Sequence, residues 1–272
     1  MRTQRGEGGA YDGPIISLKK VSLKFRSPRG EVAALAGVDL DIRAGEFVTV
    51  VGPSGCGKST LLNLIVGLIE ASEGNLLYRG RSARGINRDI GYVTQADNLF
   101  PWRTVLQNVM FGLEMRGIGS RAEQRDRAMQ LIERVGLAAF ANHYRHELSG
   151  GMRQRVNIMR ALAYDPKIIL LDVPFGPLDA QSRLHLQDLL LTLWSERPEI
   201  TLIFITHDLT EAIALGDRVV VMSARPGCVR EIVPIDLARP RDIFTIHTNP
   251  QFRSLYDRIW LQLAAEMKEA TQ

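Results

Sequence analysis

Cysteine is nearly absent from the sequence, since Cys56 and Cys228 are the only two among 272 residues. Two cysteines cannot build a disulfide framework, and neither belongs to a CxxC pair, so we expect a protein of a reducing compartment. The first 14 residues hold no apolar segment of the kind found in signal peptides. The most apolar stretch, residues 61–69 (LLNLIVGLI), is far shorter than the roughly 20 residues that span a bilayer. If a membrane is involved, we expect a partner to supply the span.

Internal repeats, low-complexity segments and a strong excess of one charge are also lacking. Hydrophobic residues make up 45% and charged residues 24%, as in a globular protein with a large core. The net charge of +4 fits a phosphate-rich ligand or an anionic surface, but only weakly. We expect a flexible tail over residues 1–14, one main domain over 15–225 with a helical subdomain at about 100–160, and a short C-terminal extension over 226–272.

Alternating apolar residues between positions 15 and 42 predict antiparallel strands with turns at SPRG (27–30) and AG (36–37). Longer apolar runs and helical spacing predict the remaining elements: strands over 46–51, 168–172, 201–206 and 218–224, and helices over 61–72, much of 104–148, 150 to Asp165-Pro166, and about 180–195. Strands that alternate with helices predict an α/β fold with a mostly parallel sheet. We expect the first strands to form a separate antiparallel β subdomain.

Residues 52–59 (GPSGCGKS) match the pattern G-x-x-x-x-G-K-[ST] between a predicted strand and a predicted helix. Glycines allow backbone N–H groups to converge on phosphate oxygens at a helix N-terminus, so this phosphate loop predicts a P-loop NTPase core. Lys58 would reach the β- and γ-phosphates, and the Ser59 hydroxyl would ligate Mg²⁺. Cys56 occupies a variable position of the loop. The residues predicted to bind nucleotide here are Gly52, Pro53, Ser54, Gly55, Cys56, Gly57, Lys58, Ser59 and Thr60.

Asp172 ends the aliphatic strand IILLD, about 115 residues after the phosphate loop. A carboxylate at the tip of such a strand can hold Mg²⁺ through water, so Asp172 is predicted as a metal ligand together with Ser59. The next residue, where a nucleotide-hydrolysing enzyme often needs a second carboxylate, is Val173.

The stretch LSGGMRQR (148–155) is a second predicted anion-binding turn before a helix. It resembles the signature of the ATP-binding cassette (ABC) family, with Met152 in the glutamine position. The resemblance implies that this signature turn (Ser149, Gly150 and Gly151) contacts the γ-phosphate of ATP bound by a second ATP-binding subunit, identical or different. The expected ligands are therefore ATP and Mg²⁺, held in a head-to-tail dimer.

Other family landmarks occur in the family's order over residues 25–220. Gln95 resembles the glutamine that reports on Mg²⁺ and the γ-phosphate, and His207 resembles the switch histidine that touches the γ-phosphate. Residues 176–179 (GPLD) resemble the loop that communicates across the dimer. Phe25 stands where an aromatic ring stacks on adenine, and packing into the strand core is the alternative.

Within this family, the segments after Gln95 and at the C-terminus resemble importers of nitrate, sulfonate, taurine and related small anions. The resemblance implies a subunit bound peripherally at the cytoplasmic face of the membrane, with a permease docked near Leu99 to Trp102 and a periplasmic solute-binding protein as an indirect partner. Inward packing of Phe100 and Trp102 is the alternative to docking.

Val173 leaves the activity of the chain's own site open, because the family pattern has a glutamate general base at this position. Loss of a general base lowers a rate by about 10²–10⁴-fold. The chain is therefore a slow ATPase, a degenerate partner of an intact cassette, or a sequence changed so that it traps ATP. A non-hydrolysing ATP-gated clamp is the rival class. A nucleic-acid clamp is disfavoured because residues 60–148 hold no sustained heptad run, so no nucleic-acid partner is expected.

Overall fold

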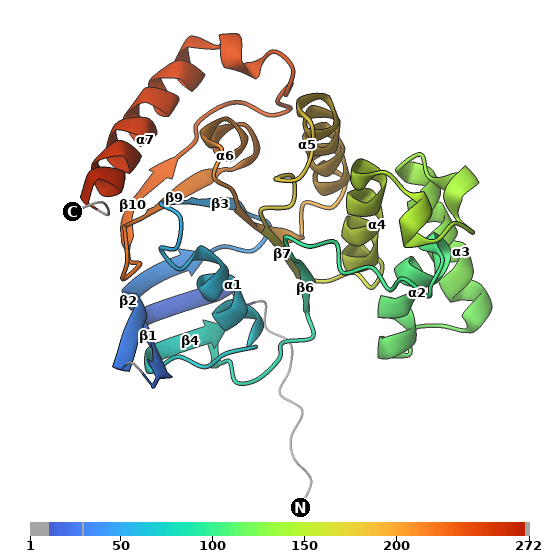
Figure 1. Ribbon diagram of the computed structural model, residues 1–272, viewed down its shortest axis with the longest axis horizontal. Helices are drawn as coiled ribbons and strands as arrows, with labels where there is room; N and C mark the ends of the chain where they lie inside the picture. The colour runs from blue at the N-terminus through green and yellow to red at the C-terminus, as the bar shows by residue number, and fades with distance from the viewer. Residues whose placement is uncertain (1–10, 29, 270–272) are drawn as a thin grey trace, which may run out of the picture.

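The structure is a computed structural model that describes residues 11–28 and 30–269. Two sheets and a helical arm make up the molecule (Figure 1). Most of the predicted tail over residues 1–14, and residue 29 of the predicted SPRG turn, lie outside the described residues. The fold is the predicted α/β architecture, with one antiparallel and one mostly parallel sheet.

The central sheet has the order β10-β9-β3-β8-β7-β6 and is parallel except at its β10 edge. Its strands are β3 (Phe47–Val51), β6 (Ile90–Val93), β7 (Ile168–Asp172), β8 (Thr201–Ile205), β9 (Arg218–Met222) and β10 (Val229–Pro234). Every residue of β3, β7 and β8 is buried, which explains their unbroken apolar runs. Successive side chains point to opposite faces, so Ile168 and Leu170 enter one core while Ile169 and Leu171 enter the other.

The second sheet is antiparallel, in the order β2-β1-β4-β5. Its strands are β1 (Ile16–Ser27), β2 (Gly30–Ile42), β4 (Glu73–Tyr78) and β5 (Arg81–Ser82). The predicted turn at Ala36-Gly37 is wrong, because β2 runs through both residues. Gly37 has φ +54°, and its N–H donates to the Ser22 hydroxyl while the pairing with β1 shifts register. A β-bulge therefore uses the glycine in place of a turn.

Helix α1 (Lys58–Val66) lies between the two sheets and buries Leu61, Leu62, Leu64, Ile65 and Val66. It is shorter than the predicted helix over 61–72, because Gly67 ends it at φ +82°. A Cβ at Gly67 would lie 1.8 Å from the carbonyl oxygen of Gly85, so only glycine fits this position. No helix in the described part of the chain is both long and apolar enough to cross a membrane.

A helical arm stands at the right of Figure 1 and contains α2 (Val105–Arg116), α3 (Arg121–Arg134) and α4 (Gly150–Leu162), with short 3₁₀ turns η1 (Ala138–Phe140) and η2 (Arg145–Glu147). Thr104 and Ser120 cap α2 and α3 through capping boxes with Gln107 and Glu123. One face of α3 is buried against the arm, which matches the helical spacing of its apolar residues.

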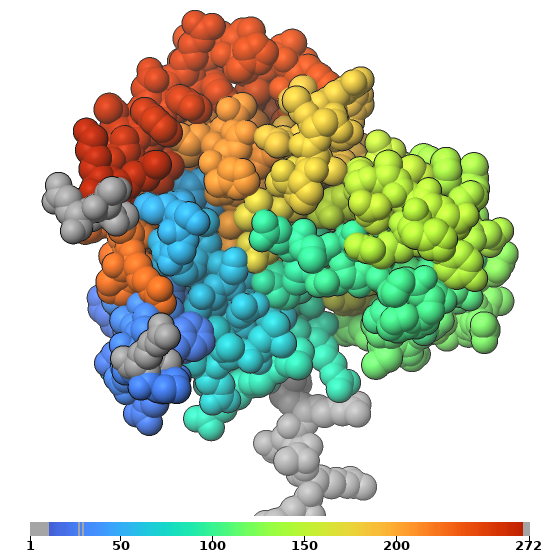
Figure 2. Space-filling view, in the orientation of Figure 1, coloured from blue at the N-terminus to red at the C-terminus, as the bar shows by residue number. Residues whose placement is uncertain are grey.

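The C-terminal part contains α5 (Ala180–Ser195), α6 (Leu209–Leu215), η3 (Ile246–Thr248) and α7 (Pro250–Glu269). In Figure 2 the end of this segment with α7 (red) and the arm (green) occupy different sides of the face in view. Arg241 is buried, and its guanidinium donates to five backbone carbonyls, including that of Gly216 at the end of α6. Burial lowers the pKa of Arg241 to about 10, so it stays charged at neutral pH and closes this helix end.

Candidate functional site

The phosphate loop is tightly ordered between β3 and α1. Gly55 and Gly57 have φ +74° and +104°, conformations that favour glycine. Lys58 Nζ donates to the backbone carbonyls of Gly52 and Pro53 at 2.9 and 2.8 Å. The amine is therefore held inside the loop by neutral acceptors, which a phosphate oxygen would outcompete. Cys56 is buried, and burial raises the pKa of its thiol, so it stays protonated at neutral pH.

Asp172 lies beside the phosphate loop at the end of β7 and is 7% exposed. Burial raises the pKa of its carboxyl, while Ser59, Lys58 and Tyr92 act in the opposite direction. The Asp172 Oδ1 atom is buried and has no hydrogen-bond partner among the described residues. A buried oxygen that lacks a partner beside the Ser59 hydroxyl fits a magnesium ion, which is usually held by one or two protein oxygens together with phosphates and water.

The site also uses Tyr92 of β6, which sequence reasoning missed. Burial and the Asp172 carboxylate both raise the pKa of the Tyr92 hydroxyl, which donates to Asn63 of α1 at 3.1 Å. This phenol therefore stays protonated and lies against the negative charge of Asp172. Tyrosine in an apolar strand gave no signal of this role, because the contact depends on strand order.

A cleft of about 470 Å³ opens beside the phosphate loop. Most residues predicted to bind nucleotide or metal line it: Phe25, Gly52, Ser54, Gly55, Gly57, Lys58, Ser59, Thr60, Gln95 and His207, with Val173. Three further residues in its lining, Ala34, Ile205 and Arg225, were not predicted. The structure thus brings residues from positions 25 to 225 to one cleft. Phe25 is 43% exposed there and is not part of the strand core.

The signature turn lies apart from this cleft. Ser149 caps α4 by accepting a hydrogen bond from the Met152 N–H at 3.3 Å. Ser149 and Gly150 are exposed, and a Cβ at Gly150 would meet Leu178 of the following loop at 3.6 Å. The turn and residues 176–179 therefore adjoin each other at the surface, where a second molecule could reach them.

Asp97 links the segment after Gln95 to the helical arm. Its carboxylate pairs with Arg145 at 2.7 Å and with Arg153 of α4 at 3.1 Å. Burial acts to raise the pKa of Asp97, but the two arginines and a backbone N–H outweigh it, so the pKa is lowered. Arg160 of α4 adds a bond to the Asn98 carbonyl at 2.8 Å. These contacts tie the segment after Gln95 to the helix that starts at the signature turn.

Val173 has φ +45°, in the left-handed region that β-branched residues rarely adopt. Its N–H donates to the Ile205 carbonyl at 3.0 Å, and its carbonyl accepts from Gly176 at 3.3 Å. The surrounding chain therefore imposes a backbone conformation that costs roughly 1–3 kcal/mol for a poorly suited residue. The valine side chain lines the cleft but can neither accept a proton nor orient water.

An apolar groove of about 580 Å³ lies between the central sheet and the arm. Phe100, Phe111, Met115, Tyr92 and Tyr164 are among its lining residues. Trp102 is 71% exposed, whereas Leu99 is 4% exposed and points into the core. The inward packing considered for Phe100 and Trp102 is therefore wrong for Trp102, whereas Phe100 is half-buried against Trp102 and Phe111.

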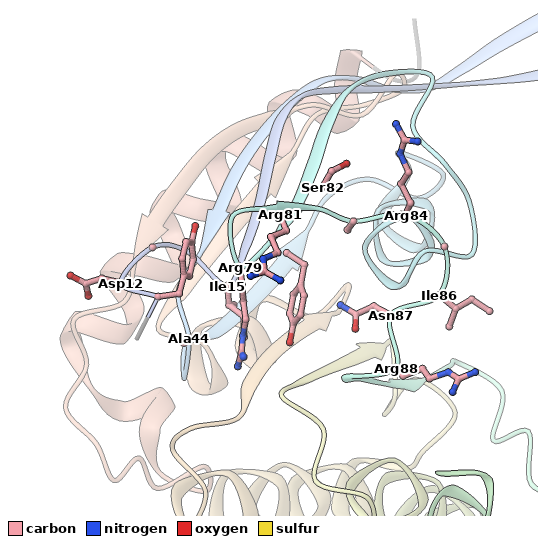
Figure 3. A pocket seen from close by; sticks show the side chains of 15 residues that line it. Asp12, Ile15, Ala44, Arg79, Arg81, Ser82, Arg84, Ile86, Asn87 and Arg88 are labelled. Atoms are coloured by element: carbon pink, nitrogen blue, oxygen red, sulfur yellow. The ribbon is translucent and has the colours of Figure 1, made fainter. Parts of the chain in front are cut away.

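A second hollow, of about 1130 Å³, adjoins the β4–β5 hairpin. Figure 3 shows Arg79 and Arg81 close to each other there, while Arg84 and Arg88 point away from them. All residues predicted to bind nucleotide lie outside this hollow. Its arginines are exposed to solvent, so this hollow is a charged surface and not part of the nucleotide site.

The central sheet, the phosphate loop and the Asp172 carboxylate together define a P-loop nucleoside triphosphatase. The ABC transporter family model matches residues 35–176. The sequence is 48% identical over 227 residues to an uncharacterized ABC transporter ATP-binding protein of Methanocaldococcus jannaschii, with 84% of each chain covered. It is 40% identical to an aliphatic sulfonates import ATP-binding protein of Bacillus thuringiensis, covering 91% of this chain and 95% of that protein.

A solved dimer of an ATP-binding cassette, in a post-hydrolysis state with ADP and Pi, has a TM-score of 0.73 and 36% sequence identity. The match covers 82% of this chain and all of that one. The chain belongs to the ABC transporter family, as an ATP-binding ATPase subunit. The predicted family and fold class are confirmed.

Proposed function

We propose that the chain is the ATP-binding subunit of an importer for a small anion of the sulfonate, nitrate or taurine class. The carrying observation is that Tyr92 interacts with Asp172 at the end of β7 and also lines the apolar groove. An occupant of the groove would therefore sit one residue from the metal-binding carboxylate. The names of the sulfonate-import relatives support the substrate class.

The groove fits a short apolar helix of a membrane permease. Phe100 packs edge-on against Phe111 with ring centroids 4.7 Å apart, leaving an aromatic wall that is unusual on a protein surface without a partner. In this proposal the subunit works peripherally at the cytoplasmic face of the membrane, with the main domain over residues 15–225. A solute-binding protein would deliver the anion to the other side of the permease.

Within the cleft, Lys58 would bind the β- and γ-phosphates, and Ser59 and Asp172 would hold Mg²⁺ with Gln95 beside them. The ion would neutralise phosphate charge when bound. His207 would contact the γ-phosphate. The exposed Ser149 and its two glycines would complete the site of a second cassette, because they cannot reach the cleft of their own chain. The solved dimers among similar structures support this arrangement.

We propose further that Val173 makes hydrolysis at this site slow. Steady-state ATPase activity of purified Val173→Glu should exceed that of the natural chain by about 10²-fold or more, because a general base is restored. Val173→Gln is the matched control. Glutamine has the shape of glutamate but cannot act as a base, so the rate should stay near that of the natural chain. Equal rates for the natural chain and Val173→Glu, within a factor of about two, would show that this account is wrong.

The importer itself is tested in the host cell. Deletion of the gene should abolish uptake of one labelled anion among an alkanesulfonate, taurine and nitrate. Complementation with the natural gene should restore uptake, whereas Lys58→Ala or Phe111→Asp should not. Normal uptake of all three anions in the deletion strain contradicts the proposed substrate class.

A degenerate subunit paired with an intact cassette is the second candidate, favoured by Val173. Affinity purification of the chain from its host would then bring down a second ABC subunit in equal amount. Recovery of this chain alone would favour the homodimer.

A further inference from the structure

The turn between β9 and β10 (residues 223–228, the β9–β10 turn) packs directly on the phosphate loop. Gly227 donates to the Ala34 carbonyl at 2.9 Å and accepts from the Ala36 N–H at 3.0 Å. A Cβ at Gly227 would lie 2.0 Å from the Cys56 carbonyl oxygen, so only glycine permits this approach. The turn is therefore a fixed wall of the nucleotide cleft, although about 170 residues separate it from the phosphate loop in sequence.

Arg225 of this turn extends into the cleft lining. Its Nε donates to the Ala33 carbonyl at 3.4 Å, a long bond, and its side chain is exposed. Among the described residues, no carboxylate pairs with this guanidinium. Elsewhere on the surface, arginines such as Arg26 and Arg218 have acidic partners. No described carboxylate therefore draws the Arg225 guanidinium away from a ligand in the cleft.

The position of Arg225 places it at the end of the cleft occupied by Phe25. Ala33, its backbone partner, is opposite Lys24 in the β1–β2 pairing, and Phe25 is opposite Val32. Arg225 and Phe25 line the same cleft, and a planar guanidinium together with an aromatic ring suits the flat face of a base.

The last helix holds this turn in place. Glu266 of α7 is 8% exposed, and one of its carboxylate oxygens accepts from the Ala224 N–H at 2.9 Å. The other oxygen pairs with Arg230 at 2.7 Å. The bond to Ala224 lies one residue before Arg225, so a carboxylate of the C-terminal extension contacts the turn that carries Arg225.

We infer that Arg225 binds the nucleoside end of the nucleotide together with Phe25, and that Glu266 positions Arg225 from α7. The inference rests on nucleotide binding in the cleft and is independent of the transported anion and of the hydrolysis rate. The C-terminal extension would then stabilise the nucleotide site by positioning Arg225.

The first test compares ligands with and without a base. Arg225→Ala should weaken equilibrium binding of ATP and ADP by about 5- to 30-fold, the range of a stacked cation in a partly desolvated site. Binding of tripolyphosphate should change less than twofold. Arg225→Lys should not restore affinity, because an ammonium lacks the planar face.

Arg26→Ala is the matched control, because it removes the same charge from the strand residue next to Phe25. Its side chain is 88% exposed, and it lies outside the cleft lining. Nucleotide affinity should stay within twofold of the natural chain. Equal losses for ATP and tripolyphosphate in Arg225→Ala would overturn contact with the nucleoside, as would unchanged affinity for every ligand. If ADP binding in the natural chain also fails, the nucleotide site itself is wrong.

The second test concerns Glu266. Glu266→Ala should weaken ADP binding by about threefold, and Glu266→Gln, whose amide oxygen can still accept from Ala224, should recover most of it. In an Arg225→Ala background, Glu266→Ala should have no further effect. An equal loss in both backgrounds would show that Glu266 supports the fold without positioning Arg225. Circular dichroism of each variant confirms that it is folded.

Discussion

The phosphate loop and the signature turn are both glycine-containing turns at a helix N-terminus, but they differ in the partners of their polar groups. The phosphate loop has its own lysine, and the amine is satisfied by two carbonyls of the loop. The signature turn has one hydroxyl, which caps its own helix, and it faces solvent. The phosphate loop is complete within the chain, whereas in our proposal the signature turn completes the site of a second molecule. The comparison suggests that binding and assembly can be disabled separately.

Lys58→Ala is expected to have the largest effect. A charge-assisted hydrogen bond contributes about 1.5–3 kcal/mol, so loss of Lys58 should weaken ATP binding by about 10- to 100-fold or more. Equilibrium titration with ATP measures it. Lys20→Ala, a change at an exposed lysine paired with Asp39, is the control and should leave affinity intact. Unaltered affinity in Lys58→Ala would contradict the assignment of the loop.

Ser149→Asp is expected to separate assembly from binding. Aspartate caps a helix about as well as serine, so stability should change by less than about 0.5 kcal/mol. Its charge would repel a γ-phosphate, and ATP-dependent dimerisation should weaken by about 10-fold or more. Analytical ultracentrifugation with ATP gives the dimer fraction, and ATP affinity at low protein concentration should be unchanged. A dimer of normal strength would show that the turn is not at the interface.

Asp172→Asn should stabilise the nucleotide-free chain at neutral pH. Burial raises the pKa of Asp172 in the folded state, so its ionised form opposes folding above that raised pKa and ceases to do so as the pH falls below 3.8, its ordinary value. The unfolding midpoint should rise by a few degrees, at roughly 2–4 °C for each kcal/mol in a domain of this size. The advantage should disappear with Mg²⁺ and ATP. A lower midpoint at neutral pH would contradict it.

Asp97→Asn should have the smallest effect and the opposite sign. The pKa of Asp97 is lowered in the folded state, so its ion pairs stabilise the chain at neutral pH and are lost as the pH falls below 3.8 through the lowered pKa. Because the pairs are partly exposed, the loss should be about 0.5–1 kcal/mol in urea unfolding at pH 7. Glu114→Gln is a control, because it removes a surface ion pair with Arg103 and leaves the ion pairs of Asp97 intact. Together the two variants test whether ionised Asp172 opposes folding while ionised Asp97 stabilises it.

Local sequence patterns predicted the parts of the molecule that depend on neighbouring residues. The phosphate loop, the strand ending at Asp172 and the capped helix at Ser149 needed only spacing and glycine. Gly37 was misread because a positive φ looks the same in a turn and in a bulge, and only the pairing with β1 decides between them. Helix α1 was predicted too long because apolar residues continue beyond Gly67.

Contacts between distant segments could not be predicted in this way. Arg225 reaches the cleft because β9 is paired with β3, and Tyr92 meets Asp172 because β6 is paired with β7. Neither strand pairing can be predicted from a local sequence pattern. The roles of Gln95, His207 and the signature turn came from family resemblance, and they remain predictions for individual residues.

The hydrogen bond between Glu266 and Ala224 has a practical consequence for anyone who shortens this chain. Every sequence motif named above precedes residue 225. A chain truncated soon after residue 225 would therefore contain all of these motifs. Such a chain would lack the carboxylate that anchors the wall beside the base. Its weaker binding of ATP would then lower the measured ATPase rate, and that loss could be mistaken for an effect of Val173.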